Sequence, residues 1–390
     1  MKLLFVSDSF KGSLTSIQTV HLLTKAACEV FDQPDCSGVA VADGGEGTTD
    51  AVISATGGEK VYVKVKGPLF EEETVYYGKL PGNRAVLEMA AASGLPLLPE
   101  CKRNPLNTTS YGTGQMIKDA LDHGFTDISI AIGGSATNDG GIGAMIALGA
   151  RFLDEQGNAL KGIGRDLVHI SAIDLSNLDT RLKKTKITIM SDVTNPLCGP
   201  NGATYTFGGQ KGGTPEILSV LEQGMQNYRN IIRKEFGIDP DELEGGGAAG
   251  GLGTALRVFL NGEMKSGIDT VLDLIGFDER LKGVDFVVTG EGKTDWQSCF
   301  GKVLQGIGER CLKYGIPVVA LSGSLGRGAE QVYEHGICSI MTTVNAPMSL
   351  KEAMNNAEQL YYSSAVRMFR FIQTGIILGE QSRVKEPSIP

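Results

Sequence analysis

The segment DISIAIGGSATNDGGIGAMIALGA, residues 127–150, has the pattern of a buried strand, a loop and a helix. Residues 128–132 are a short apolar, β-branched run, and residues 142–148 repeat apolar and small side chains at helical spacing. The loop between them is almost entirely glycine and small polar residues. Its glycines permit positive φ and a close approach of backbone to a ligand, and Asn138 or Asp139 can cap the helix.

Two interpretations of this loop are open. Bare backbone N–H groups at the start of a helix form an anion site, and polar side chains in the loop add donors for an oxygen-rich ligand. The alternative is a tight strand-to-helix turn with a well-made cap. The same composition recurs elsewhere in the chain, and this recurrence favours the ligand-binding interpretation.

The composition restricts the class of protein. A chain of 390 residues is too long for one core, so we expect two or more domains. The net charge of -9 argues against general nucleic-acid binding but not against a small anionic substrate. Because no apolar run is long enough for a membrane span and no signal-peptide pattern opens the chain, we expect a soluble, cytoplasmic protein without a membrane partner. Seven cysteines without C-x-x-C pairs are typical of reduced thiols.

A β/α unit opens the chain. Residues 2–7 read as an apolar strand, and residues 14–31 have a helical pattern with Ser13 as the expected N-cap. Asp8 and Lys11 therefore fall at the carboxyl end of a strand, where open α/β sheets place ligands. Lys11 could neutralise a phosphate or carboxylate, or it could be a solvated lysine in a surface turn.

A second unit repeats this geometry. Residues 39–42 read as a strand, and Asp43 and Glu46 follow it among glycines before another helix. Two carboxylates of this kind could hold Mg²⁺, a hard cation that prefers oxygen ligands. The alternative is that both only charge and cap the helix N-terminus.

Further chemistry-bearing residues follow later strands. Asp192 comes two residues after an apolar strand at residues 186–190, where it could accept a proton from a substrate hydroxyl, bind a metal or cap an Asn-Pro turn. Lys211 lies in a glycine loop, and residues 245–253 form another that resembles a backbone cradle. The Gly-Lys-Thr at Lys293 fails as a P-loop because Val287 stands where that motif needs its first glycine.

The order of these elements predicts the fold class. The opening and closing parts of the chain alternate β and α, whereas the strands expected near residues 59–89 have no helices between them. We predict an α/β protein of two domains, in which a doubly wound, mostly parallel, Rossmann/flavodoxin-like domain is interrupted by a mixed-sheet α/β domain. The predicted domains are 1–66 with 284–378, the inserted 67–283, and a disordered tail at 379–390.

Several motifs together carry a resemblance. They are Asp8-Ser9-Phe10-Lys11-Gly12-Ser13, Ala42-Asp43-Gly44-Gly45-Glu46-Gly47-Thr48, residues 133–141, Ser191-Asp192-Val193 with Asn195-Pro196-Leu197, residues 245–253, and Gly290-Glu291-Gly292. In this order they look like the bacterial class I glycerate kinases, over almost the whole chain. The resemblance implies a two-domain α/β enzyme that uses ATP and Mg²⁺ to phosphorylate a hydroxyl of glycerate, and similar members usually yield 2-phosphoglycerate.

Two positions depart from the family pattern. Lys293 stands where Gly-Glu-Gly-Arg-x-Asp would have arginine, and Gly209 stands where Phe-Gly-Pro-Gln-Lys-Gly would have proline. Lysine keeps the positive charge but lacks the two-pronged geometry of a guanidinium group. We therefore expect a weaker or differently aimed phosphate contact there, with the reaction class unchanged.

Direct phosphoryl transfer fits both the residues and the resemblance, because it depends mainly on positioning and charge neutralisation. We assign the acceptor hydroxyl to Asp192 and the phosphoryl group or glycerate carboxylate to Lys11. We further predict substrate contacts at Asp8, Ser9, Lys211 and Lys293, nucleotide phosphate contacts at Gly133, Gly134, Ser135, Thr137, Asn138, Gly246, Gly247 and Gly250, and Mg²⁺ ligands at Asp43, Glu46 and Glu291.

The predicted function is thus transfer of the ATP γ-phosphoryl group to D-glycerate in a cleft between the domains, most simply giving 2-phosphoglycerate. The expected partners are glycerate and ATP, and a homodimer is left open. One alternative is a non-catalytic sugar-acid sensor, and another is a kinase for a different small hydroxy acid. A dinucleotide-dependent dehydrogenase is disfavoured because no strand is followed by an intact G-x-G-x-x-G.

Overall fold

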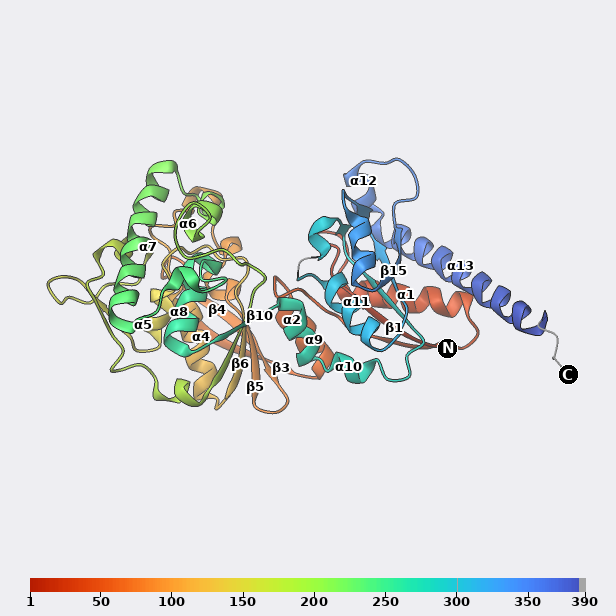
Figure 1. Cartoon of the computed structure of the whole chain (residues 1–390), viewed down its shortest axis with the longest axis horizontal. Coiled ribbons are helices and arrows are strands. Elements are labelled where there is room, and N and C mark those ends of the chain that lie inside the picture. The colour runs from red at the N-terminus through yellow and green to blue at the C-terminus, as the bar shows by residue number, and fades with distance from the viewer. Residues whose placement is uncertain (300, 386–390) are drawn as a thin grey trace. The chain divides into compact units, whose positions relative to one another are not determined.

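The computed structural model describes residues 1–299 and 301–385. The chain divides into two compact units. The terminal unit combines Met1–Asp43 with the chain from Val271 on, and the inserted unit is Gly44–Thr270. In Figure 1 the terminal unit accordingly contains both the red start and the blue end of the chain.

The sheet of the terminal unit is entirely parallel, in the order β15-β13-β11-β1-β2. Its strands are β1 (Lys2–Ser7), β2 (Asp35–Gly38), β11 (Phe286–Gly290), β13 (Val318–Ser322) and β15 (Ile337–Thr342). Counted within this unit, the order is 2-1-3-4-5, as in flavodoxin-like sheets. The strand order reverses between β1 and β11, so ligands are expected at the carboxyl ends of these two strands.

Helices cover both faces of this sheet. Alternate β1 residues, Leu3 and Phe5, join one buried cluster with α1 (Ser16–Val30) and α13 (Ala357–Lys385). Leu4 lies on the other face, where α11 packs against the strands. The other helices of the unit are α10 (Phe277–Arg280), α11 (Val303–Lys313) and α12 (Leu350–Asn355), and α9 (Gly267–Leu274) crosses the unit boundary. A small parallel pair, β12 (Lys293–Thr294) and β14 (Ser324–Leu325), completes it.

The inserted unit contains a mixed sheet in the order β10-β9-β6-β5-β4-β3. Its strands are β3 (Glu59–Lys66), β4 (Glu72–Leu80), β5 (Arg84–Glu88), β6 (Asp127–Ala131), β9 (Lys186–Met190) and β10 (Glu263–Lys265). β3, β4 and β5 pair antiparallel, and the remaining neighbours pair parallel. A separate hairpin pairs β7 (Arg151–Leu153) with β8 (Ala172–Asp174).

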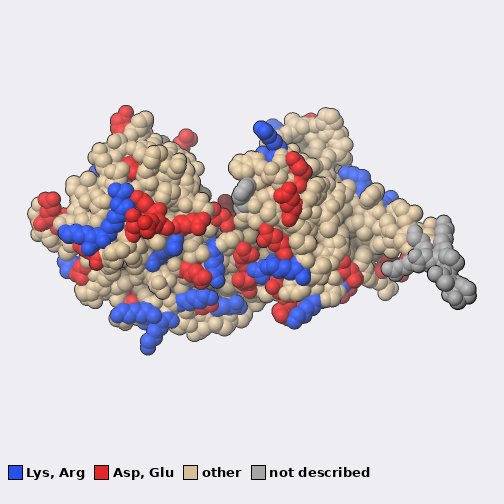
Figure 2. Space-filling model, in the orientation of Figure 1, with Lys and Arg blue, Asp and Glu red and all other residues tan. Residues whose placement is uncertain are grey.

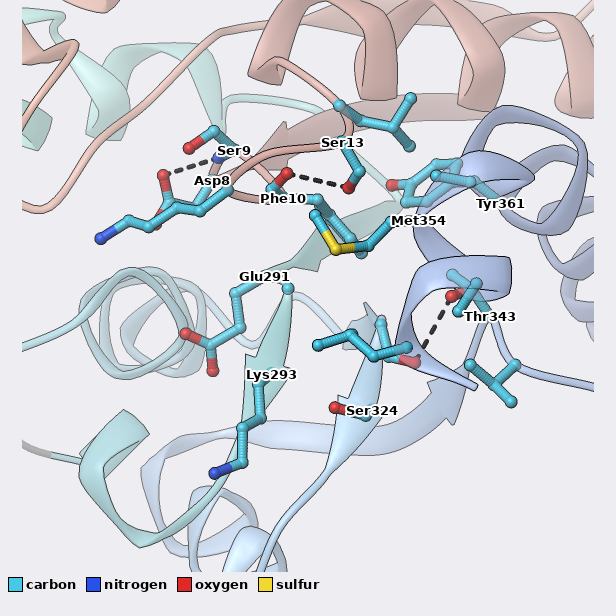
Figure 3. Close-up of a pocket in the computed structure, with 18 of the residues that line it drawn as sticks. Asp8, Ser9, Phe10, Ser13, Glu291, Lys293, Ser324, Thr343, Met354 and Tyr361 are labelled. Atoms are coloured by element: carbon cyan, nitrogen blue, oxygen red, sulfur yellow. Dashed lines mark hydrogen bonds between the residues drawn. The ribbon is translucent and has the colours of Figure 1, made fainter. Parts of the chain in front are cut away.

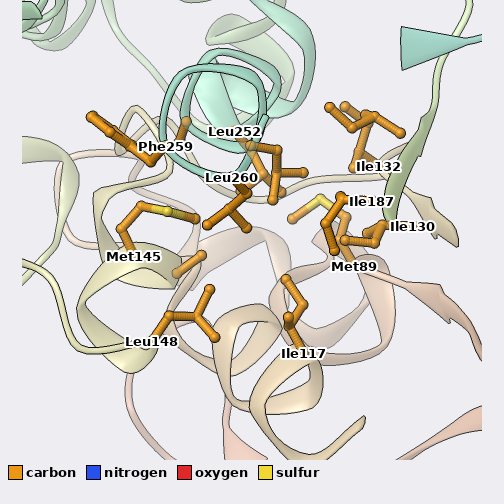
Figure 4. Packing of buried hydrophobic residues seen from close by; sticks show 14 of the residues in the cluster. Met89, Ile117, Ile130, Ile132, Met145, Leu148, Ile187, Leu252, Phe259 and Leu260 are labelled. Atoms are coloured by element: carbon orange, nitrogen blue, oxygen red, sulfur yellow. The ribbon is translucent and has the colours of Figure 1, made fainter. Parts of the chain in front are cut away.

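One large apolar core holds the inserted unit together. Side chains of the sheet, such as Ile130 and Ile187, meet helix residues such as Met145 and Leu252 (Figure 4). The helices are α2 (Thr48–Thr56), α3 (Ala90–Ser93), α4 (Tyr111–Asp122), α5 (Ile142–Ala147), α6 (Ala203–Phe207), α7 (Pro215–Phe236) and α8 (Leu252–Leu260). Short 3-10 helices of the whole chain lie at Leu95–Leu97, Glu100–Lys102, Gly164–His169, Thr180–Lys184, Gly209–Lys211, Pro240–Glu242, Ala248–Gly251, Trp296–Cys299 and Ala329–His335.

The predicted fold class is confirmed, because the structure has a parallel α/β sheet and a mixed α/β sheet. The unit boundaries differ from the predicted ones at both ends of the insertion. Residues 44–66 belong to the inserted unit because β3 pairs along its full length with β4. Residues 271–283 belong to the terminal unit, where Arg310 of α11 forms ion pairs with Asp273 and Asp278.

Three local expectations are corrected. The second strand is β2 at Asp35–Gly38 instead of residues 39–42. The first helix is capped by Thr15, which forms a reciprocal capping box with Gln18, and the Ser13 hydroxyl donates instead to the carbonyl of Phe10. The predicted disordered tail overlaps α13, which continues to Lys385. Residues 386–390 lie outside the described residues.

The surface and helices give two further observations. On the face drawn in Figure 2, acidic and basic side chains lie interspersed rather than segregated by sign. Among the described residues, no helix combines the length and the apolarity that crossing a membrane requires.

Candidate active site

Two carboxylates lie at the point where the strand order reverses. Asp8 directly follows β1, and Glu291 directly follows β11. The backbone N–H of Asp8 donates to the carbonyl of Gly290 at 2.9 Å, so the pairing of the two strands extends by one more residue. The sequence prediction that Asp8 follows a strand end is confirmed, and the topology makes its strand the neighbour of the strand that Glu291 follows.

A pocket of about 530 Å³ opens at these strand ends (Figure 3). All of its lining residues belong to the terminal unit. One arm is polar and contains Asp8, Ser9, Lys11, Asp43, Glu291, Lys293 and Lys302. The other arm is largely apolar and contains Phe10, Leu14, Val344, Leu350, Met354 and Tyr361.

Glu291 is held in one orientation by hydroxyl groups. Its Oε1 atom accepts hydrogen bonds from Thr294 Oγ1 at 3.0 Å and from Ser298 Oγ at 2.5 Å. Because the single hydroxyl hydrogen of Thr294 is used in this way, Ser322 Oγ donates to Thr294 at 2.7 Å. Burial raises the pKa of Glu291, and the two hydroxyl donors and then Lys302 oppose that rise. The carboxylate is therefore fixed and partly desolvated.

Asp8 is a carboxyl group with a strongly raised pKa in the pocket. Burial and then the negative charge of Asp43 raise the pKa of Asp8 to about 7, and Glu291 adds to the rise. The N–H of Ser9, which donates to Asp8 Oδ1 at 2.6 Å, and the charge of Lys11 act in the opposite direction. Three carboxyl groups thus act on one another electrostatically in one pocket.

The lysines of the polar arm supply compensating positive charge. Lys293 forms an ion pair with Asp295 at 2.9 Å and is mostly exposed. The positive charge of Lys302 lowers the pKa of Glu291, and that of Lys11 lowers the pKa of Asp8. Ammonium groups that line a pocket in this way can neutralise the oxygens of a phosphate chain.

Asp192 lies in the inserted unit, at the carboxyl end of β9 as predicted, and is exposed. Its Oδ1 atom accepts a hydrogen bond from the backbone N–H of Gly267, the first residue of α9, at 3.3 Å.

Glu46 also belongs to the inserted unit and is exposed, whereas Asp43 and Glu291 belong to the terminal unit. The carboxylate that accepts hydrogen bonds from the N-terminal backbone of α2 is Glu88, which binds the N–H groups of Gly47 and Thr49.

The structure brings the predicted phosphate loops together inside the inserted unit. Gly133 and Gly134 are exposed, but the remainder of the loop to residue 141 is buried. The N–H of Gly140 donates to the carbonyl of Gly250 at 2.9 Å, which joins this loop to residues 245–253. Asp139 accepts hydrogen bonds from Ser110, Gly141 and Gly143.

Many backbone donors of these glycine loops therefore already have acceptors in the protein. Gly246 and Gly247 donate to the carbonyls of Leu243 and Asn195. A side chain at Gly250 would place its Cβ atom 2.1 Å from the carbonyl oxygen of Thr137, so the two loops require glycine for their mutual packing. Asn138 reaches Thr204 Oγ1 at 3.1 Å. This geometry supports the alternative of a tight turn for the buried part of the loop.

Lys211 is also internal to this assembly and is 2% exposed. Its ammonium group donates to Ser135 Oγ at 2.8 Å and to the carbonyl of Thr137 at 2.7 Å. Burial lowers the pKa of Lys211 to about 7, with the charge of Asp139 acting in the opposite direction. We therefore assign Lys211 to the linkage of two loops rather than to direct substrate contact.

The sequence analysis missed several residues of the pocket. Thr294 of β12 and Ser298 of the following 3-10 helix lie at short spacings after Glu291, so a search for hydroxyl partners near that acid could have found them. Lys302 lies just before α11 and belongs to no motif that would have identified it from the sequence. Tyr361 belongs to no motif and is fully buried, yet it also lines the apolar arm.

The fold and pocket define a doubly wound α/β protein whose acidic, lysine-lined site lies at the reversal of strand order. Residues 3–373 match the model of the glycerate kinase family, and the chain belongs to that family. It is 42% identical over 380 residues to the glycerate 2-kinase of Escherichia coli strain K12, covering 97% of this chain and 99% of the relative. It is 43% identical to the glycerate kinase of Halalkalibacterium halodurans, covering 92% and 94%.

The comparison with solved structures agrees. A crystal structure of a Salmonella typhimurium LT2 protein, assigned as a glycerate kinase 2, superposes with a TM-score of 0.87 at 39% identity. The match covers 96% of this chain and 99% of the other.

Proposed function

We propose that the protein transfers the γ-phosphoryl group of ATP to a hydroxyl of D-glycerate and yields 2-phosphoglycerate. Its membership of the glycerate kinase family supports an ATP-dependent kinase with glycerate as acceptor. The 2-phospho product is supported by the similarity to the Escherichia coli protein, which is named a glycerate 2-kinase. The structural observation that carries the proposal is that Asp8, Asp43 and Glu291 line, together with lysines, the pocket at the ends of β1 and β11.

This cluster suits a hard divalent cation. No group of three or more His, Cys, Asp or Glu side chains in the described part of the chain is arranged as a ready metal site. The oxygen-only chemistry of Asp8, Asp43 and Glu291 nevertheless fits Mg²⁺, and the pKa of Asp8 is raised partly by the other two carboxyl groups. An ion that enters with the ATP phosphates would take its protein ligands from among these carboxylates, and when bound it would neutralise charge on the phosphate oxygens.

The remaining roles follow from charge and position. Lys11, Lys293 and Lys302 would orient the phosphate chain and offset its charge in the polar arm. Asp192 is assigned as the group that accepts the proton of the attacking hydroxyl, because it is an exposed carboxylate at a strand end. Direct phosphoryl transfer requires little covalent chemistry from the protein, so positioning and charge neutralisation account for most of the catalysis.

A phosphorus NMR time course tests the proposal. The protein is incubated with ATP and Mg²⁺ in three tubes, which contain D-glycerate, L-glycerate or no acceptor. The proposal expects a phosphomonoester signal only with D-glycerate, split by one methine proton, as the 2-phosphate requires. A signal split by two equivalent methylene protons would exclude the 2-phosphate, and ATP left intact in all three tubes would contradict the glycerate kinase assignment.

A further inference from the structure

The pocket is larger and more apolar than glycerate requires. Its volume of about 530 Å³ lies in the range of sites that enclose ligands with a ring system, whereas glycerate is a three-carbon acid without an apolar part. The polar arm alone supplies the charged groups that a small anion needs. The apolar arm therefore calls for a second chemical group on the ligand.

Two aromatic side chains form the base of the apolar arm. The rings of Phe10 and Tyr361 meet edge to face, with centroids 5.2 Å apart and an interplanar angle of 87°. Phe10 is 5% exposed and Tyr361 is fully buried, so both are held in place by the core. The base of the arm is consequently rigid and apolar.

The short helix α12 supplies the opposite edge of the arm. None of its residues is buried, and Leu350 is 77% and Met354 is 37% exposed, although both line the pocket. In Figure 3, Met354 lies beside Phe10 and Tyr361, away from Glu291 and Lys293. Two water-exposed apolar side chains opposite a buried aromatic pair are the walls that a flat, weakly polar ring would cover.

We propose that the apolar arm binds the adenosine part of ATP, with the phosphates extending to the lysines of the polar arm. The inference rests on the proposed function, which it deepens by assigning the nucleotide to the pocket of the terminal unit. Doubly wound sheets bind nucleotides at a reversal of strand order, and this pocket opens at that point. A nucleotide also joins in one molecule the apolar ring and the polyanion that the two arms separately suit.

This placement differs from the sequence prediction that residues 133–141 and 245–253 bind the nucleotide phosphates. Much of the backbone of those loops is bonded within the inserted unit, as the bond from Gly140 to Gly250 shows. The polar arm instead presents three lysine side chains. In this proposal no residue of the inserted unit is assigned a contact with the adenine ring.

The test uses two substitutions that remove apolar surface without adding charge. In the double variant Leu350→Gln and Met354→Gln, the KM for ATP should rise at least tenfold, while the KM for glycerate should change less than twofold. Leu312→Gln on α11 is the matched control, because Leu312 is 62% exposed and does not line the pocket. Thermal melts of all three proteins should coincide, since none of the altered side chains is buried.

Ligand fragments separate the two arms. Adenosine should compete with ATP for the wild-type protein and lose at least tenfold in affinity for the double variant, whereas tripolyphosphate should inhibit both equally. Unchanged ATP KM and adenosine affinity in the double variant would overturn the inference, and so would a rise confined to the KM for glycerate. Equilibrium dialysis with adenosine needs no turnover, so a wild-type protein that binds adenosine but transfers no phosphate would contradict the proposed function alone.

Discussion

Lys211 donates from Nζ to the carbonyl oxygen of Thr137 at 2.7 Å, inside the inserted unit. Burial lowers the pKa of this amine from 10.5 to about 7. Between these values the unfolded chain holds a proton that the folded chain has released, so the unfolding free energy should rise with pH across this window. The contribution of Lys211 should increase by up to about 1.4 kcal/mol per pH unit.

The comparison that isolates this contribution is between the wild type and Lys211→Met. Urea unfolding from pH 7.5 to 9.5 should show a steeper rise for the wild type, because the variant has no titrating group at this position. The exposed Lys184 provides the control Lys184→Met, whose profile should run parallel to that of the wild type. If the pH profile of the unfolding free energy of Lys211→Met also ran parallel to that of the wild type, the lowered pKa of Lys211 would be refuted.

Gly250 and Gly237 form a matched pair for testing why the loops are rich in glycine. Both have positive φ, at +67° and +68°, but a Cβ atom at Gly250 would lie 2.1 Å from the carbonyl of Thr137, and one at Gly237 would meet nothing within 4 Å. Gly237→Ala should cost roughly 1 kcal/mol, the ordinary penalty for alanine in this conformation. Gly250→Ala should cost several times more, measured by chemical denaturation without ligand.

The same pair distinguishes packing from ligand binding. If the loop at residues 245–253 were a cradle with room for phosphate, Gly250→Ala would fold with nearly normal stability and lose only ATP affinity. That combination would restore the sequence prediction for these glycines.

Glu291→Gln separates charge from shape in the pocket. The Gln amide oxygen can still accept the hydrogen bonds of Thr294 and Ser298, but the negative charge is lost. We expect kcat/KM for Mg²⁺-ATP to fall by about 100-fold or more, the scale on which one preorganised electrostatic group contributes. Exposed Glu330 offers the control Glu330→Gln, which should keep normal kinetics.

Glu291→Gln should lower activity without lowering the thermal stability of the protein. The pKa of Glu291 is raised in the folded protein, so its ionised form at pH 8 opposes folding. Glu291→Gln should therefore melt at the same temperature as the wild type or higher. A variant that lost both activity and stability would indicate that the charge holds the loop together instead.

Asp192→Asn tests the proposed acceptor of the hydroxyl proton. The Asn side-chain oxygen can still accept the N–H of Gly267, so the local structure should persist. We expect kcat to fall by about 10² to 10⁴, the usual contribution of a general base, with little change in the KM for glycerate. Wild-type turnover with unchanged glycerate KM would remove Asp192 from the mechanism.

Local patterns were sufficient to predict the fold class and the strand-end position of Asp8. Apolar runs of strand length identify the strands, and a residue that follows such a run must lie at the edge of a sheet. The pairing of β1 with β11 could not be read in this way, because nothing in either strand specifies its neighbour. The reversal of strand order, which locates the pocket, depends on that pairing.

The glycine loops show the other limit of the sequence. A glycine that admits a phosphate and a glycine that admits another loop have the same signature, since both need backbone without a Cβ atom. Gly250 is of the second kind, and only its 2.1 Å approach to the carbonyl of Thr137 shows this. The apolar arm was missed for a related reason, because an apolar side chain that lines a pocket, such as Met354 or Tyr361, has the same sequence signature as one that fills a core.

The pairing of Leu3 with Phe286 sets a constraint on the order of folding. The inserted unit is one continuous piece of chain and can fold as soon as it has left the ribosome. β1 and β2, though made before the inserted unit, must wait for β11, β13 and β15 before their sheet is complete. These two strands are thus among the last to become protected, and during synthesis the apolar β1 is exposed to chaperones and to other nascent chains.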